Sequence, residues 1–333
     1  MLVGYDWWLP IDASAHGAGI DRLIVLVHWF MLLLFVGWGA YFIYCLWRFR
    51  SRPGHEATTK LPKAKLSKLS EVAVIVVEAV LLCALSIPLW AQVRGTGHAP
   101  GSNDRIEIRV QAQQFAWNIQ YPGADGKFGR SNPKLMDEVE NPIGIDRVND
   151  PAAADDIVTL NVLHIPVNRN VLVHLSSKDV IHSFSLPLLR IKQDSVPGIS
   201  VPVWFKATRT TDQVRLMMVQ TYPARPEVIG KVNDSNGNPT HVAMADYANA
   251  SGSPILAQGD PITADRITAL AAAGIERFEA APSVPTQIAC AQLCGMNHFQ
   301  MRGFLYIDTQ EKFDAWMKAR QAELPAAGDD YGY

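Results

Sequence analysis

The chain has 333 residues, enough for one or two domains with a hydrophobic core, and its formal net charge is −2 at pH 7. A charge so close to zero argues against a nucleic-acid partner. The average hides a segregation along the chain, because residues 1–94 are apolar apart from one basic patch, whereas the remainder has the composition of an ordinary soluble domain.

Two stretches near the N-terminus are apolar and long enough to cross a membrane. Residues 23–47 contain no charged side chain, and at about 1.5 Å rise per residue they exceed the roughly 30 Å hydrocarbon core of a bilayer. The second span, predicted over residues 71–91, is interrupted by Glu78, an intramembrane acid and so a candidate functional residue. The first span lacks the short apolar region and small-residue cleavage site of a signal peptide. We therefore predict a transmembrane hairpin of two helices.

The segment between the spans, residues 48–70, is strongly basic. It holds one acid, Glu56, and seven basic side chains: Arg48, Arg50, Arg52, Lys60, Lys63, Lys65 and Lys68. Positive charge in a short loop marks the cytoplasmic side of a membrane. The N-terminal segment, residues 1–22, and a large domain over residues 104–333 are then predicted on the opposite, periplasmic side.

From Asp104 onward, apolar and polar residues alternate. The alternation predicts a strand pair or one long bent strand over residues 105–121, two or three strands over 155–189, and two more over 201–222. A last strand is followed by an amphipathic helix with Phe313, Trp316 and Met317 on one face. Many short strands separated by Pro and Gly favour an all-β sandwich or barrel.

Two stretches depart from this rhythm. Residues 122–156 are rich in Pro, Gly, Asn and Asp and are predicted to form a long surface excursion. Residues 224–284 have the pattern of a small α+β insertion, with a helix capped by Thr263 and a body over 266–273.

The segment "CAQLCGMNHFQM", residues 290–301, brings together Cys290, Cys294, His298 and Met301. Flanking prolines and Gly295 argue against one continuous helix and favour a loop between two strands. A disulfide would close a very small loop and would leave the histidine and methionine unexplained. Zinc suits two cysteines and a histidine but has little use for a thioether. Soft thiolates with imidazole and methionine favour copper, and two thiolates suggest that both bridge two copper ions.

A two-copper site predicts a second histidine from outside the cluster. The strand region offers His164, His174, His182 and His241, and a single histidine on a strand is more often a packed residue than a ligand. His182 differs by its context, because it lies in "VIHSFSLPLL", at the end of an apolar strand and just before a turn that contains proline.

The chain resembles subunit II of the haem–copper cytochrome c oxidases. The resemblance rests on the helix hairpin and on three stretches: "QAQQFAWNIQYPG", "LHIPVNRNVLVHLSSKDVIHSFSLPLLRIKQDSVPG" and "CAQLCGMNHFQM". It covers most of the chain apart from the 224–284 insertion. It implies a cupredoxin-like β-domain on a bacterial inner-membrane anchor, with residues 104–333 in the periplasm.

The resemblance also implies a set of copper ligands. His182 and His298 would each bind one copper of a dinuclear copper A centre, Cys290 and Cys294 would bridge the pair, and Met301 would be the axial ligand of one ion. Gln292 would offer its backbone carbonyl to the other ion. The family usually has Glu at that position, whose carboxylate also reaches a magnesium or manganese ion at the border with subunit I. Gln292 lacks the charge, which leaves that second metal site in doubt.

Four further positions match family residues and also have simpler explanations. Phe115 and Trp117 occupy the region that accepts electrons, although core packing of a strand explains both. Glu71 matches an acid at the cytoplasmic mouth of a proton path, or it is a snorkelling or capping group. Asp194 matches an acid near the face that meets subunit I, or it is a turn residue.

The function implied is electron transfer within a respiratory oxidase. A cytochrome c would reduce the copper centre, which would pass the electron to haem in subunit I for oxygen reduction coupled to proton pumping. The partners would be subunit I, subunit III, other oxidase subunits and membrane lipid. Four rivals remain: a quinol oxidase subunit II, which has lost the copper ligands present here; nitrous oxide reductase, whose large propeller is absent; a copper carrier, for which one anchor suffices; and a zinc-stabilised module.

Overall fold

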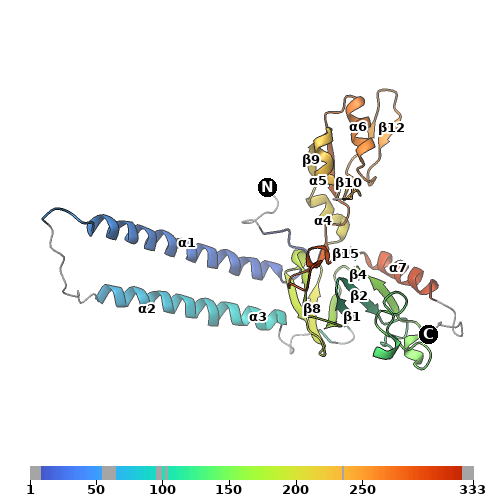
Figure 1. The fold of residues 1–333 in the computed structure, drawn as a ribbon, viewed down its shortest axis with the longest axis horizontal. Helices are drawn as coiled ribbons and strands as arrows, with labels where there is room; N and C mark the ends of the chain where they lie inside the picture. The colour runs from blue at the N-terminus through green and yellow to red at the C-terminus, as the bar shows by residue number, and fades with distance from the viewer. Residues whose placement is uncertain (1–8, 55–64, 95–99, 102–103, 235, 325–333) are drawn as a thin grey trace. The chain divides into compact units, whose positions relative to one another are not determined.

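The computed structural model describes residues 9–54, 65–94, 100–101, 104–234 and 236–324. The chain divides into two compact units (Figure 1). His16–Ala99 form a helical unit, and Met1–Ala15 together with Pro100–Tyr333 form a β-rich unit. Within the predicted basic loop, Lys60 and Lys63 lie outside the described residues, as do positions 1–8 of the predicted N-terminal segment.

The helical unit contains the two predicted spans. The first is α1 (Gly17–Arg48), and the second is built from α2 (Lys65–Val80), a π-helical turn (Leu81–Ser86) and α3 (Ile87–Arg94). Both have the length and the apolar composition to cross a membrane, with mean hydropathy values of 2.2 and 2.6. The helices α1 and α2 each begin six residues before the corresponding predicted span. The prediction began later because it followed the apolar residues, whereas the first two turns of each helix also contain charged residues.

The π-helical turn has a cause in the sequence. Pro88 has no N–H to continue the regular helical ladder, which frees a carbonyl one turn earlier. Within the widened turn, the Ser86 hydroxyl donates to the Leu81 carbonyl at 2.9 Å. One turn before it, Glu78 lines a cavity of about 310 Å³ together with apolar residues of both helices, including Val27 and Phe30 of α1.

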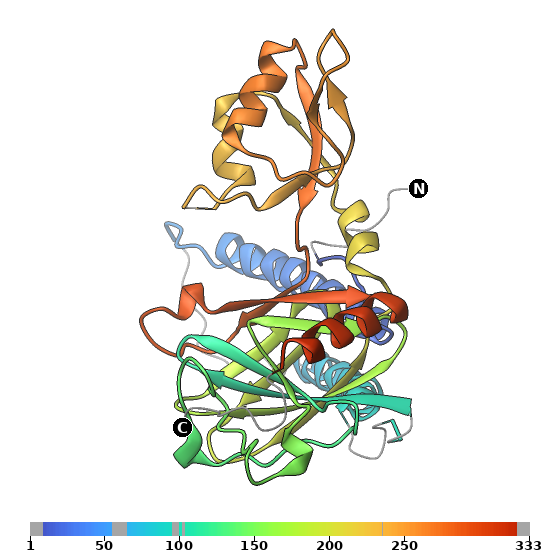
Figure 2. The ribbon, with the colours of Figure 1, turned by 90° about the vertical axis from the view of Figure 1, so that its right-hand side faces the viewer.

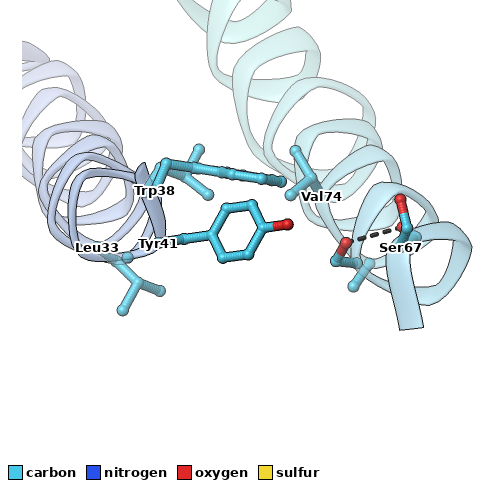
Figure 3. Close-up of a pocket in the computed structure, with 9 residues that line it drawn as sticks. Leu33, Trp38, Tyr41, Ser67 and Val74 are labelled. Atoms are coloured by element: carbon cyan, nitrogen blue, oxygen red, sulfur yellow. Dashed lines mark hydrogen bonds between the residues drawn. The ribbon is translucent and has the colours of Figure 1, made fainter. Parts of the chain in front are cut away.

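A second, larger cavity of about 560 Å³ lies nearer the loop that joins the helices (Figure 3). Trp38 and Tyr41 extend from α1 toward α2, with their rings edge-to-face at 6.0 Å. The facing side of α2 presents Ser67 and Val74. The cavity is therefore apolar with hydroxyl groups at its margin.

Most of the β-rich unit consists of two five-stranded sheets. The first sheet has the order β3-β2-β1-β5-β8: β1 (Arg105–Gln113), β2 (Ala116–Tyr121), β3 (Ile157–Leu160), β5 (Asn170–Ser177) and β8 (Val201–Lys206). The second has the order β4-β15-β14-β6-β7: β4 (Val162–Pro166), β6 (His182–Leu186), β7 (Ile191–Ser195), β14 (Gln287–Cys290) and β15 (Arg302–Asp308). All pairs are antiparallel except β1 with β5 and β15 with β4.

One hydrophobic core joins the two sheets, as the alternation predicted. Fully buried residues of both contribute to it, among them Trp117, Phe184 and Phe205. The helix α7 (Gln310–Ala322) covers one side through buried Phe313, with partly buried Trp316 and Met317 beside it. The prediction of two apolar helices followed by a β-sandwich is confirmed.

The N-terminal segment before α1 belongs to this β-unit. Ser14 pairs with Ala207 in an isolated antiparallel bridge, and the Ala13 amide donates to the Leu188 carbonyl at 2.8 Å. Ile11 and Ala13 are buried, at 4% and 0% exposure. The segment is therefore part of the folded domain, although about eighty residues of helical unit separate it from the rest.

The structure corrects the strand prediction at three places. Residues 155–189 contain four strands and not two or three, because Asn161 makes a sharp break between β3 and β4 with a φ of 60°. Residues 201–222 contain β8, the helix α4 (Thr211–Met217) and β9 (Gln220–Pro223), where two strands were predicted. A capping box between Thr210 and Gln213 starts this helix. His182 begins a strand instead of ending one.

The excursion and the insertion both have structure of their own. Residues 122–156 contain two 3₁₀ turns, Pro133–Leu135 and Pro151–Ala153, and a small cluster formed by Ile143, Ile145 and Ala153. The insertion, shown in yellow and orange in Figure 2, has a three-stranded sheet, a hairpin and a separate core. Its elements after β9 are α5 (Ile229–Val232), β10 (His241–Ala243), β11 (Tyr247–Ala248), β12 (Pro254–Leu256), α6 (Ala264–Ala272) and β13 (Arg277–Pro282). Thr263 caps α6 as predicted.

Candidate metal centre

The sulfur-rich segment is a loop between two neighbouring strands. Cys290 ends β14, Met301 directly precedes β15, and only a 3₁₀ turn, His298–Gln300, lies between them. The Cys290 amide donates to the Met301 carbonyl at 3.3 Å, which holds the two ends of the loop together. The prediction of a loop in place of a continuous helix is confirmed.

Strand pairing brings His182 to this loop. β14 pairs with β6, with Cys290 opposite Phe184, and the Ala291 amide donates to the Ser183 carbonyl at 2.9 Å. His182 begins β6 and is completely buried. A residue more than a hundred positions upstream is therefore placed against the cysteines by the backbone of the sheet.

The donor atoms of five residues converge. Nδ1 of His182 lies 3.1 Å from Sδ of Met301 and 3.9 Å from Sγ of Cys290. The two cysteine sulfurs are 3.8 Å apart. Sγ of Cys294 is 3.4 Å from Nδ1 of His298 and 3.7 Å from Sδ of Met301. Both cysteines are free thiols, so the disulfide alternative does not describe this structure.

The donors form two groups around the sulfur pair. His182 and Met301 are in contact with each other, whereas His298 contacts Cys294. The Gln292 carbonyl oxygen lies 3.2 Å from the Cys290 sulfur. Two thiolates and two imidazoles would also complete a tetrahedral zinc site, but zinc would leave the thioether and the carbonyl unused, whereas soft sulfur donors combined with imidazole favour copper.

Asp179 supports the histidine that β6 supplies. One carboxylate oxygen lies 2.8 Å from Nε2 of His182, and the other accepts the Gln114 amide at 2.6 Å. An imidazole that donates from Nε2 to a carboxylate presents an unprotonated Nδ1 to a metal. The Gln114 side chain donates to the Cys294 carbonyl at 2.5 Å. Neither residue was predicted from the sequence, and the only available signal was the position of Asp179 three residues before His182.

The surroundings of the two thiols shift their pKa values in opposite directions. Burial would raise the pKa of Cys290, but hydrogen bonds with His182, with the backbone of Ser183 and Gln292, and with Cys294 together outweigh it and lower the pKa to about 6. Burial and the neighbouring Cys290 charge raise the pKa of Cys294 to about 11. Burial alone would lower the pKa of His182, but hydrogen bonds and charge interactions with Cys290 and Asp179 more than compensate, so the pKa of His182 is raised overall. One thiol is thus prepared to bind metal as a thiolate, and the second loses its proton when a cation arrives.

Aromatic residues lie next to the cluster. Trp117 is fully buried, with its ring 6.3 Å from that of His182 and 5.5 Å from that of Phe184. Phe115 is partly buried and packs against Gly295, where an added Cβ would come within 3.1 Å of the phenyl ring. Gly295 has a φ of 137°, so this position of the loop requires glycine for both reasons.

The remaining predicted residues lie elsewhere. Glu71 is on α2 in the helical unit, where it accepts a hydrogen bond from the Ser67 hydroxyl at 3.2 Å. Asp194 is exposed on β7, directly across from Ser183. The Gln292 residue is exposed at the surface of the loop.

Comparison with known proteins identifies the family. A family model described as cytochrome c oxidase subunit II, periplasmic domain, matches residues 106–214. The alternative cytochrome c oxidase subunit 2 of Bradyrhizobium diazoefficiens is 33% identical over 205 residues, which are 61% of this chain and 70% of that protein. The chain belongs to the cytochrome c oxidase subunit II family.

More distant subunit II proteins match over shorter ranges. The cytochrome c oxidase subunit 2 of Cereibacter sphaeroides is 29% identical over 184 residues, 50% of this chain and 55% of that protein, so the chain spans about half of that relative. The crystal structure of the periplasmic domain of subunit II of cytochrome oxidase of Bradyrhizobium japonicum is 17% identical and covers 68% of this chain and 99% of its own, with a TM-score of 0.32. A superposition this loose places no residue, so the candidate ligands of this subunit II chain are assigned from their contacts.

Proposed function

We propose that this subunit accepts electrons from a cytochrome c at a dinuclear copper A centre and passes them to haem in subunit I, where oxygen is reduced and protons are pumped. The observation that carries the proposal is the convergence of His182, Cys290, Cys294, His298 and Met301 around a pair of sulfurs 3.8 Å apart. The proposal is also supported by membership of the cytochrome c oxidase subunit II family.

Each ligand has a separate role in the proposal. Cys290 and Cys294 would supply the thiolates that both ions share, His182 and Met301 would hold one ion, and His298 with the Gln292 carbonyl would hold the other. The bound ions would supply a one-electron redox couple shared over two metals and two thiolates. The backbone bonds that join β14 to β6 and close the loop fix the ligands, which keeps rearrangement on electron transfer small.

The electron-accepting role of the aromatic residues belongs to the same proposal. Trp117 contacts the His182 ring, and Phe115 packs against the loop at Gly295. Both aromatic side chains therefore lie between the β1–β2 region and the candidate ligands. We assign Glu71 to the mouth of a proton path and Asp194 to the border with subunit I. Gln292 contributes its carbonyl only, and its uncharged side chain does not favour a magnesium or manganese ion at that border.

The proposed setting is a bacterial inner membrane, with the hairpin as anchor and the β-unit in the periplasm beside subunits I and III. The N-terminal segment supports this arrangement, because it folds onto the β-unit and must therefore lie on the same side as that unit. Two spans return the chain to its starting side, as a hairpin requires.

Metal analysis and electron paramagnetic resonance of the purified full chain after copper loading test the proposal. We expect two copper ions per chain and hyperfine structure from one electron shared by two equivalent copper nuclei. Cys290→Ser and Cys294→Ser should each abolish that signal, whereas the control Cys83→Ser, on the π-helical turn, should preserve it. A single copper, a single spectroscopically silent zinc, or a disulfide between Cys290 and Cys294 would overturn the assignment.

A further inference from the structure

The outer face of the first sheet contains a polar cleft that the electron-transfer function does not use. Its volume is about 300 Å³, and its floor is formed by side chains of β1, β2 and β5. Ser131 and Ile143 of the excursion also line it, as does Ser200. In Figure 2 the excursion is the green segment beside the teal strands β1 and β2.

Strand register places the floor residues in two rows. Arg109 stands opposite Gln120 of β2 on one side and opposite His174 of β5 on the other. Two residues further along β1, Gln111 stands opposite Ser176. Residues directly across neighbouring strands have Cβ atoms about 5 Å apart on the same face. The cleft therefore has a cation at its centre, with amide, imidazole and hydroxyl groups around it.

The cation has no carboxylate in direct contact among the described residues. The Arg109 guanidinium donates to the Gly129 carbonyl at 3.2 Å and lies 4.2 Å from the centre of the Phe128 ring. The nearest acid on its strand, Glu107, is engaged by Arg105 at 2.6 Å and by His174 at 3.1 Å. Remaining N–H groups of Arg109 are thus available to an anionic oxygen in the cleft.

Two acceptors in the floor need donors. The Oε1 atoms of Gln111 and Gln120 are buried and accept no hydrogen bond from any residue that the structure describes. Gln120 is completely buried, and its amide nitrogen is held by Asp156 at 2.7 Å, which fixes the direction of its oxygen. A buried amide oxygen without a donor bears its desolvation penalty uncompensated, so an occupant of this cleft should bring O–H groups.

We propose that this cleft binds a hydrogen phosphate group, either free or as a phosphate monoester. Arg109 and the hydroxyls of Ser131, Ser176 and Ser200 donate to its anionic oxygens. Its own hydroxyl, where it is protonated, donates to Gln111 or Gln120. Sulfate has the same shape but carries no proton near neutral pH, so it leaves both amide oxygens without a donor. The site should therefore select phosphate over sulfate.

Isothermal titration calorimetry on the full chain in detergent and phosphate-free buffer tests the proposal with inorganic phosphate, glycerol 3-phosphate and sulfate. We expect saturable binding of one phosphate per chain and affinity for sulfate at least about tenfold lower, equivalent to about 1.4 kcal/mol. Tighter binding of glycerol 3-phosphate than of inorganic phosphate would identify an esterified group as the ligand, and the reverse would identify the free ion.

Matched variants locate the binding. Arg109→Gln should weaken phosphate binding at least about tenfold, while Arg225→Gln, which removes an exposed arginine of the insertion, should leave it unchanged. Gln111→Leu should reduce the preference for phosphate over sulfate. An unchanged copper signal in each variant reports an intact fold. Absence of saturable phosphate binding by the wild type, equal affinity for sulfate, or full binding by Arg109→Gln would overturn the proposal.

Discussion

His182 has its two ring nitrogens committed to different tasks. Nε2 faces Asp179, and Nδ1 faces the sulfur atoms of Met301 and Cys290. The carboxylate therefore fixes both the ring orientation and the tautomer that a metal requires. The buried position of His182 makes this arrangement rigid, because no solvent competes for either nitrogen.

Asp179→Asn should weaken copper binding by about 10- to 100-fold, since the amide retains the shape of the side chain but stabilises the required tautomer less well. Competition with a copper chelator measures the affinity, and paramagnetic resonance reports any change in the environment of the ligands. Asp314→Asn, in α7, is the matched control and should behave as the wild type. Equal copper affinity of Asp179→Asn and the control would show that the contact does not position His182.

Asp156 gives the domain a pH-dependent stability. Burial raises its pKa to about 6, above the ordinary value of 3.8. The protonated form therefore contributes stability that is fully present below about pH 4 and is lost as the pH rises through about 6. Asp156→Asn should remove this loss and raise the free energy of unfolding at pH 7 by roughly 1 kcal/mol relative to the wild type.

Denaturation of both proteins between pH 4 and pH 8 measures the effect. The difference between Asp156→Asn and the wild type should grow as the pH rises to about 6 and then stay constant, whereas Glu138→Gln, at an exposed acid of the same excursion, should give no such trend. A difference independent of pH would mean that Asp156 is not the titrating group.

For individual residues, the sequence indicated the candidate ligands more readily than the residues that form hydrogen bonds with them. Cys290, Cys294, His298 and Met301 are close in the chain, so their spacing alone indicated a site. His182 was distinguished from the other histidines by its sequence context, but its role as a ligand was implied only by the family resemblance, because contact between β6 and β14 is not visible in local patterns. Asp179 and Gln114 act through one hydrogen bond each, and polar residues in turns are too common for such a contact to be predicted.

Among the elements, the insertion is the most separable. It enters and leaves through β9 and β13, where Gln220 stands opposite Ala280, and its core is distinct from that of the sandwich. Replacing residues 221–279 with an Asn-Gly turn connects Gln220 directly to Ala280. These two residues are already paired across the strands, so a two-residue turn can join them without moving either. The shortened chain should fold and give an unchanged copper signal.

Oxidase assembly and cytochrome c oxidation then test what the insertion does. Unchanged assembly and turnover of the shortened chain would exclude a role at a subunit border and a role in shaping the donor dock. Loss of copper binding would contradict the expected independence of the two cores. The intact chain carrying Arg225→Gln controls for a change of surface charge alone.

The segment before α1 stabilises the sandwich although the helical unit separates it from the rest of the domain. Ile11 is 4% exposed, so Ile11→Ala should lower the stability of the β-unit by about 2 kcal/mol through loss of apolar contacts. Val139→Ala, at a side chain 88% exposed, should have almost no effect. Thermal unfolding followed by near-ultraviolet circular dichroism distinguishes the two, and equal midpoints would show that the segment does not contribute.

Strong periodicity explains which elements were predicted correctly. The β1–β2 pair, the capped helix α6 and the amphipathic α7 each have a clear pattern or cap. The helix α4 was missed because seven residues are too few for helical periodicity to differ from strand alternation. The pairing of residues 13–15 with residues 188–208 was also missed, since long-range strand contacts have no local signal.

For the whole molecule, sidedness follows from the basic loop and the apolar spans. In a chain carrying Cys45→Ala and Cys83→Ala, Val139→Cys should react with a membrane-impermeant maleimide in spheroplasts, whereas Ser51→Cys should react only after the membrane is opened. The parent without an added cysteine measures the contribution of Cys290 and Cys294. Labelling of Ser51→Cys in intact spheroplasts would reverse the proposed orientation.

The bridge between Ser14 and Ala207 also sets an order of events during synthesis. The partners of residues 13–15 lie at Leu188, Lys206, Ala207 and Thr208, so this segment is synthesised before both helices but acquires its contacts only after the later strands have been made. If the proposed topology holds, both helices must be inserted and the later strands must be on the same side of the membrane before that segment can dock. In the proposed topology, the sandwich can therefore close only after both helices have been made.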